Sequence, residues 1–170
     1  MANSASKYTV IRVTPTLDTS AYADNDVFFN ATEIPSAVIG NGGASKLISI
    51  TILNEDDVAH DIDLIFMQKS TDLGTINEAV GSNSKWTNAL AKQAGVLGVI
   101  EVDWSTSNSD FVNNLIYSSG NANPSGKAEN LPMILQAEDD SNSVYVAAVS
   151  RGGTPTVAAD DYEIILHIER

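Results

Sequence analysis

The hydrophobic pattern of this chain repeats every two residues, and this period constrains the fold more than any other feature. In YEIILHIE (162–169), one face of an extended chain is entirely apolar and the other is mostly polar. Successive side chains of a strand point to opposite sides, so the run predicts a β-strand with one face against a core. The core face is expected to hold Tyr162, Ile164, Leu166 and Ile168, and the other face Glu163, Ile165, His167 and Glu169.

Acidic turns separate further strands of this kind. KLISITIL (46–53) is followed by NEDD (54–57) and by a run at 58–67, and together they predict a β-hairpin. The turn AEDDSN joins the runs 131–136 and 143–149 and predicts a second hairpin. Together with the last strand, 162–169, this hairpin predicts a C-terminal meander of three strands. The core face of the first hairpin is expected to hold Ile48, Ile50, Ile52, Ile62, Leu64 and Phe66.

Shorter strands are predicted between clusters of Gly, Pro, Asn, Asp and Ser. They are 8–13, 27–30, 34–39, 97–102 and 111–117. With the longer runs this makes about nine or ten strands, enough for two packed sheets. The sequence therefore predicts an all-β fold, an antiparallel two-sheet sandwich of jelly-roll type, with residues 1–170 forming a single β-sandwich domain.

One segment breaks the period of two. SKWTNALAKQAG (84–95) lies between Ser84, a favoured N-cap residue, and Gly95, which suits a left-handed C-terminal cap. We predict one short helix here, lying across an open edge or end of the sandwich. Long irregular segments are predicted at 67–83 and 118–130, and such loops are usually functional or mobile.

Charge and composition exclude several classes of partner. The chain has 9 Lys and Arg against 22 Asp and Glu, a formal net charge of -13, which repels phosphate backbones and anionic lipid. There is no cysteine, so disulfides and thiolate chemistry are excluded. The sequence shows no signal-peptide pattern, and its longest apolar runs, such as 94–100, are too short to span a bilayer. We expect no nucleic-acid or membrane partner and synthesis in a cytoplasm.

No constellation typical of catalysis is visible. The HExxH, GxSxG and Walker patterns are missing. The glycine-rich segment GNGGAS (40–45) is interpreted as a turn, because it leads into a strand, whereas a phosphate-binding loop leads into a helix. His60 lies near Asp61 and Asp63, but a site needs several groups in defined roles and no nucleophile accompanies it. His167 falls on the polar face of the last strand. We therefore predict no enzyme activity, no catalytic residue and no cofactor or metal among the site residues.

Paired aspartates precede several strands and raise the question of calcium, which prefers oxygen ligands from loops. The pairs are Asp56-Asp57, Asp139-Asp140 and Asp160-Asp161. Turn chemistry is the favoured interpretation, because Asp closes Asx-turns. The last two pairs flank one predicted strand and lie about 20 Å apart at ~3.3 Å per residue, too far to share an ion. A calcium site within a single loop stays open.

The crossover VTPTLDTSAYADNDVFFN (13–30) carries three aspartates, yet it predicts a connection between strands. Pro15 excludes a central strand position, and Asp18, Asp24 and Asp26 are irregularly spaced. Leu17 and Tyr22 are expected to pin the segment to the sandwich, with the aspartates at solvent or at a subunit boundary.

Several segments resemble a group of small β-rich virion proteins of tailed bacteriophages. The similar pieces are TPTLDTSAYADNDV (14–27), the central ALAKQAGVLGVIEV (89–102) and the ending VYVAAVSRGGTPTVAADDYEIILHIER (144–170), in that order. The resemblance implies a jelly-roll or related sandwich that decorates the capsid or forms an appendage of the particle. It supplies no catalytic residues, and the irregular segment 70–83 has no counterpart in the group.

The resemblance implies a function as a capsid decoration (cement) protein on the outer capsid surface of a tailed phage. The expected partners are the major capsid protein or other virion proteins. The chain is expected to form a homo-oligomer, with a trimer favoured. It is expected in the virion, after assembly in the host cytoplasm. One alternative is a tail, fibre or portal-proximal component. Another is a carbohydrate-binding sandwich, for which the candidate aromatic residues are Trp86, Trp104, Tyr117 and Tyr145.

Overall fold

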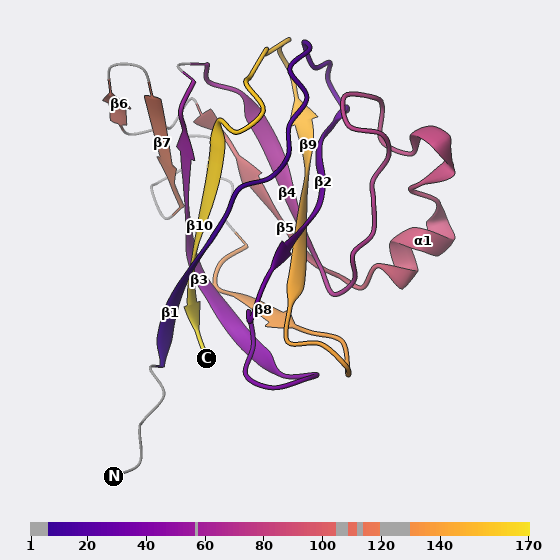
Figure 1. Ribbon diagram of the computed structural model, residues 1–170, viewed down its shortest axis with the longest axis vertical. Helices are drawn as coiled ribbons and strands as arrows, with labels where there is room; N and C mark the ends of the chain where they lie inside the picture. Colours follow the sequence, from indigo (N-terminus) through magenta and orange to yellow (C-terminus); the bar gives the residue numbers. More distant parts are fainter. Residues whose placement is uncertain (1–6, 57, 105–108, 112–113, 120–129) are drawn as a thin grey trace.

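The computed structural model describes residues 7–56, 58–104, 109–111, 114–119 and 130–170, so most of the predicted loop 118–130 lies outside the described residues. In these parts of the chain the strands are β1 (Tyr8–Val13), β2 (Val27–Ile34), β3 (Ala44–Asn54), β4 (Asp61–Met67), β5 (Val96–Val102), β6 (Ser109–Phe111), β7 (Asn114–Ser118), β8 (Met133–Gln136), β9 (Val144–Arg151) and β10 (Tyr162–Glu169). They form two antiparallel sheets that face each other (Figure 1).

The strand order confirms the predicted jelly-roll sandwich. One sheet has the order β1-β10-β3-β7-β6, with β8 also paired to β3, and the other has the order β2-β9-β4-β5. Consecutive strands such as β1 and β2, or β9 and β10, lie in opposite sheets, which is the double Greek key of a jelly roll. Within the described ranges the chain has one short helix, α1 (Asn88–Gln93), and a 3-10 turn, η1 (Ser82–Ser84).

The predicted hairpin 46–53/58–67 is wrong, because its two strands belong to different sheets. β3 pairs with β10, β7 and β8, whereas β4 pairs with β9 and β5. Asn54, at the end of β3, is buried, and its Nδ2 donates to the Val58 carbonyl at 2.9 Å and to Tyr162 Oη at 3.2 Å. Its Oδ1 accepts from the Asp56 amide at 2.9 Å. These bonds hold the chain in an arch from one sheet to the other.

The predicted C-terminal meander is also wrong. β8 pairs with β3, β9 pairs with β2 and β4, and β10 pairs with β1 and β3, so the three strands alternate between the sheets. The sequence VYVAAV of β9 explains this position, because five of these six residues are buried. A strand buried on both faces fits the centre of a covered sheet, which is where β9 lies.

Two further strand predictions need correction. The predicted strand 34–39 does not exist, because β2 runs on to Ile34 and Pro35 and Ser36 then form a turn, with Ser36 at φ 51. In β3 the register skips Ile48, since Leu47 lies opposite Ile168 and Ser49 opposite His167. This β-bulge turns Ile48, predicted in the core, outward to 40% exposure and places Leu47 in the core.

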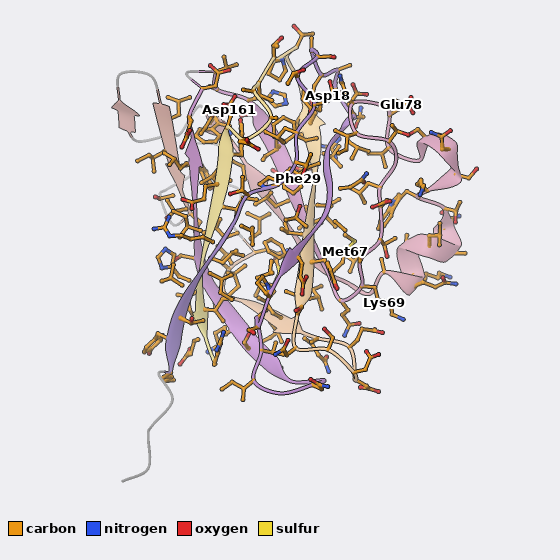
Figure 2. The ribbon with its side chains drawn as sticks, viewed as in Figure 1. Asp18, Phe29, Met67, Lys69, Glu78 and Asp161 are labelled. Atoms are coloured by element: carbon orange, nitrogen blue, oxygen red, sulfur yellow. The ribbon has the colours of Figure 1, made fainter. Side chains whose placement is uncertain are left out.

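The space between the sheets is filled by apolar side chains from both. The predicted core faces of β4 and β10 are confirmed, and Phe28, Phe29 and Phe66 are fully buried among them. Figure 2 labels Phe29 within this core. The crossover 14–26 is also confirmed as a pinned connection. Leu17 and Tyr22 are buried, and Tyr22 Oη accepts from the Asp18 amide at 2.6 Å and donates to the Phe28 carbonyl at 3.1 Å.

Candidate functional site

The outer faces of the two sheets differ in whether the chain covers them. Residues 68–95 fold over the outside of the β2-β9-β4-β5 sheet, with α1 as their outermost part (Figure 1). Beneath them lies a second apolar cluster formed by Val27, Met67, Leu73, Ala94, Ala147 and Val149. The prediction that the helix lies across an edge or end of the sandwich is therefore wrong, because it belongs to a segment that covers a sheet face.

Hydrogen bonds to β2 hold the covering segment 68–95 in place. Asn30 Nδ2 donates to the Gly74 carbonyl at 2.8 Å, and Asn30 Oδ1 accepts from the Leu73 amide at 2.9 Å. Val27 exchanges backbone hydrogen bonds with Glu78 and Asn77, both at 2.9 Å. Because these bonds involve the buried Val27 and the half-buried Asn30 of β2, the covering segment is part of the fold and not an independent loop.

The ends of α1 are partly those that the sequence predicts. The N-cap is Thr87, whose Oγ1 accepts from the Leu90 amide at 3.3 Å, whereas the predicted cap, Ser84, lies in η1. Gly95 has φ +61, as expected for the residue that ends a helix in the left-handed region. A Cβ at Gly95 would lie 2.4 Å from Gln68 Oε1 and 3.0 Å from Gln68 Cβ, so the Gln68 side chain would have to shift to admit it.

The outer face of the other sheet carries exposed apolar side chains and is not covered by the described chain. We call this surface the open face. It consists of the outward side chains of β1, β10, β3 and β8, of which the most exposed apolar ones are Tyr8 (63%), Ile134 (58%), Val10 (54%) and Ile48 (40%). A shallow hollow of about 370 Å³ runs across β1, β3 and β10, and another of about 290 Å³ lies beside Ile134. Clustered exposed apolar residues are typical of an interaction surface.

Several of the chain's basic residues lie on or beside the open face. Lys7, Arg12, Lys46 and Arg170 lie on or beside it, four of the nine basic residues of a chain with net charge -13. Lys7 and Lys46 bind Glu169, the latter at 3.2 Å, and Arg12 binds Glu163 at 2.6 Å. The hydrogen bond from Lys7, followed by that from Lys46, lowers the pKa of Glu169. The open face is thus apolar with a basic rim.

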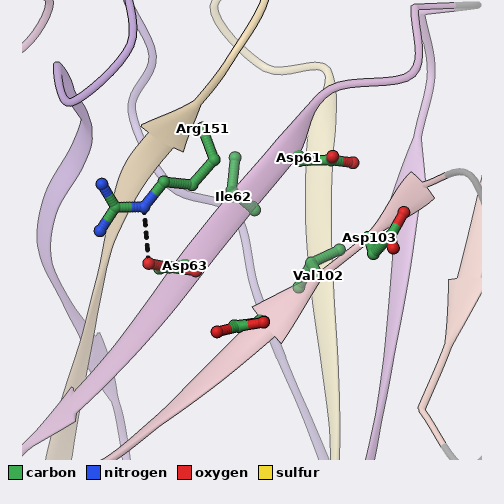
Figure 3. A pocket seen from close by; sticks show the side chains of 7 residues that line it. Asp61, Ile62, Asp63, Val102, Asp103 and Arg151 are labelled. Carbon is green, nitrogen blue, oxygen red and sulfur yellow. Dashed lines mark hydrogen bonds and ion pairs between the residues drawn. The ribbon is translucent and has the colours of Figure 1, made fainter. Parts of the chain in front are cut away.

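An acidic groove lies at the end of the covered sheet. A hollow of about 440 Å³ is lined by Asp61 and Asp63 of β4, by Glu101 and Asp103 at β5, and by Arg151 of β9 (Figure 3). Arg151 Nε donates to Asp63 Oδ2 at 2.6 Å, and Asp61 Oδ1 accepts from the Trp104 amide at 2.8 Å. Burial raises the pKa of Asp61, although the Trp104 bond opposes the shift. Among the described residues, no three acidic or histidine side chains are arranged to hold a metal ion.

The two histidines lie in different environments, and neither is placed with Asp61 or Asp63 as a catalytic pair. His60 is buried, with Nε2 3.0 Å from Ser150 Oγ and its ring 5.5 Å from that of Phe28. Ser150 is a hydroxyl neighbour that sequence analysis missed, since the contact depends on the pairing of β4 with β9. Burial lowers the pKa of His60 to about 4. The pair is sealed inside the sandwich, while His167 lies on the open face.

Burial also removes two of the four aromatic candidates for sugar binding. Trp104 and Tyr117 are 2% and 4% exposed, and their rings pack against each other at 5.9 Å. Trp86 packs against the cluster under the covering segment. A flat platform of these aromatic side chains is therefore not formed, because the core uses two of them.

The aspartates of the loops hold backbone and neighbouring side chains. Asp18 accepts from the Ser20 amide at 2.7 Å, Asp26 accepts from the Ala23 amide at 2.7 Å, and Asp24 accepts from the Gly152 amide at 3.0 Å. Asp161 accepts from the Ala158 amide. Of these residues, Asp161 belongs to a predicted pair, and its bond fits the turn chemistry that the sequence predicts there. Asp57, a member of one predicted pair, lies outside the described residues.

Two of the segments that carry the phage resemblance lie side by side. The crossover 14–27 contacts the turn after β9 through a bond from the Tyr22 amide to the Pro155 carbonyl at 3.0 Å. The Asn25 amide donates to the Ser150 carbonyl at 3.0 Å, and the Leu17 amide to the Ala159 carbonyl at 3.3 Å. Segments more than a hundred residues apart thus form one unit at one end of the sandwich.

Comparison with known proteins adds little beyond this description. The chain matches no known family and no curated protein. Among solved structures it is similar to one titled "Structure of Triatoma Virus (TrV)", with a TM-score of 0.27 and 11% sequence identity, over 96% of this chain and 63% of that one. The chain thus spans less than two thirds of that structure's chain. A similarity at this level carries no argument about function. No helix within the described ranges has the length and apolar character needed to cross a membrane.

Proposed function

We propose that the chain is a structural virion protein, and more specifically a capsid decoration protein that binds the outer surface of a tailed phage capsid. The observation that carries the proposal is the difference between the two outer faces of the sandwich. One is covered by residues 68–95, and the other exposes Tyr8, Val10, Ile48 and Ile134 within a basic rim. The assignment to tailed phages rests on the sequence resemblance, and hydrogen bonds join two of its segments, 14–27 and 144–170.

In this proposal the open face binds the shell of the major capsid protein, and the covered face points outward. Burial of apolar side chains supplies the binding free energy, and the ion pairs of Lys7, Lys46 and Arg12 with Glu169 and Glu163 give the rim a charge pattern that the capsid surface has to match. The chain's excess of acidic residues keeps free subunits apart before assembly. The protein has a binding role and performs no reaction.

Binding to capsid shells lacking the decoration protein tests the proposal. Purified protein is mixed with such shells and co-sedimented, and the variant Ile134→Asp is compared with Ile39→Asp. The two isoleucines are similarly exposed, at 58% and 60%, but Ile39 lies in the loop between β2 and β3 and not on the open face. We expect Ile134→Asp to bind at least about tenfold more weakly, and Ile39→Asp to bind like the parent. Equal binding of both variants, or no binding of the parent, contradicts the proposal.

Labelling of intact particles separates decoration from the alternative of a tail, fibre or portal-proximal component. An antibody against this chain is imaged on virions by electron microscopy. Decoration predicts label over the whole capsid lattice, whereas a portal-proximal component predicts label at one vertex and a tail component label on the tail. Label confined to a vertex or to the tail rules out decoration.

A further inference from the structure

β1 is an edge strand of the six-stranded sheet, and its backbone presents hydrogen-bonding groups at that edge. The Arg170 amide donates to the Lys7 carbonyl at 2.8 Å, so these two residues form a hydrogen-bonded pair. In an antiparallel ladder, bonded and non-bonded pairs alternate. Since Val10 lies opposite His167 and Arg12 opposite Ile165, the amides and carbonyls of Val10 and Arg12 point away from β10. No other strand of the described chain pairs with this edge.

We propose that a second copy of this chain binds here, with the two β1 strands pairing antiparallel about a two-fold axis at Val10. The outward-directed backbone groups lie at alternate residues, and Val10 is at their centre. A two-fold axis through Val10 therefore places the outward groups of one copy opposite those of the other, as pairing requires. The two six-stranded sheets become one continuous sheet across the dimer.

The side chains of β1 favour this register. Val10 is 54% exposed and would contact Val10 of the second copy, while Tyr8 would lie opposite the second copy's Arg12. Lys7 Nζ already lies 5.5 Å from the centroid of the Tyr8 ring, and Glu169 is bound by Lys7 and Lys46, so the contact that favours this register is the apolar one between the two Val10 side chains. A shift of one copy by two residues would separate the two Val10 side chains and place the charged Arg12 beside Val10.

The alternative is that Lys7 and Arg12 prevent another strand from pairing with β1, since Lys and Arg on edge strands discourage such pairing. Arg12, however, is held by Glu163 at 2.6 Å, and Lys7 by Glu169, so both charges are neutralised within the chain. β1 also contains neither a proline nor a bulge. The two-fold arrangement uses the edge of both copies and closes at a dimer. It needs no capsid and does not depend on the proposed function.

A single-cysteine cross-link tests this arrangement, because the natural chain has no cysteine. Val10→Cys would bring two thiols together at the axis, where opposite Cα atoms of a bonded pair are about 5.5 Å apart, within the reach of a disulfide. The control is Ile134→Cys, which is similarly exposed at 58% but lies on β8, away from the edge. We expect mild oxidation to convert most of the Val10→Cys protein to a covalent dimer and little of the control. Equal cross-linking of the two variants overturns the proposal.

The mass in solution provides a second test that does not depend on cysteine chemistry. Sedimentation equilibrium of the parent chain is expected to approach twice the 18.0 kDa monomer mass with rising concentration. Val10→Asp places two carboxylates at the axis and should remain monomeric over the same range, while Ile134→Asp should dimerise like the parent. A trimeric mass, a monomer at every concentration, or dimerisation of Val10→Asp overturns the proposal. Circular dichroism confirms that each variant is folded.

Discussion

At the scale of single residues, His60 links the stability of the fold to pH. Its pKa falls from 6.5 to about 4 in the folded protein because burial disfavours the charged ring. Between these values the unfolded chain binds the proton and the folded chain does not, so stability is lost as the pH falls from about 6.5 to about 4. The full shift corresponds to at most about 3 kcal/mol.

Replacement of His60 by glutamine tests this dependence. Gln cannot take up the proton, so urea unfolding of His60→Gln should lose less free energy than the parent between about pH 6.5 and pH 4. His167→Gln on the open face is the matched control, and its pH dependence should follow that of the parent. If His60→Gln and the parent show the same slope, the histidine is not the group responsible.

Asn54 shows how one buried amide stabilises a crossing between sheets. Asn54→Ala leaves the Val58 carbonyl, the Asp56 amide and Tyr162 Oη without this partner, and should reduce the free energy of unfolding by about 2–3 kcal/mol. Tyr162→Phe removes only one of these bonds and should cost about 1 kcal/mol. The exposed Asn41→Ala serves as control and should change stability by less than about 0.5 kcal/mol. Equal effects at Asn54 and Asn41 in urea denaturation would contradict this account.

At the scale of elements, the bulge in β3 makes a prediction opposite to that of the sequence pattern. Strict alternation places Ile48 in the core, whereas the observed register buries Leu47 completely and leaves Ile48 40% exposed. Leu47→Ala should therefore cost about 2–4 kcal/mol and Ile48→Ala less than about 1 kcal/mol in chemical denaturation. The reverse order of these two values would show that the bulge is misplaced.

The sequence predicts the strands far better than their partners. Period-two patterns identify β4 and β10 with the correct core faces and β1 with the correct bounds, because alternation is a local property. The pairing of strands depends on burial over the whole chain. Nearness in sequence therefore predicts a false hairpin across 54–57, where Asn54 instead holds the chain as it crosses to the opposite sheet. The open face could not be predicted either, because it depends on these pairings and on residues 68–95 covering the other sheet.

At the scale of the whole molecule, an excess of negative charge opposes compactness. With 22 acidic and 9 basic residues, the folded chain repels itself more than the expanded chain does. Raising NaCl from about 20 mM to about 200 mM shortens the screening length and should raise the thermal midpoint at pH 7 by a few degrees. Near the isoelectric point of about 4.2 the same salt step should have little effect. A midpoint at pH 7 that does not respond to salt would show that the acidic residues are already compensated by local bonds.

The position of β10 between β1 and β3 has a consequence for the order of folding. β1 has no partner within its sheet until residues 162–169 have been made, so the six-stranded sheet cannot form before β10 is available. Nearly all strand pairs join distant parts of the chain, and such topologies fold slowly because long loops must close first. Until then the edge of β1 and the apolar core residues are open to chaperones, and a chain stopped before residue 162 leaves β1 without its neighbour.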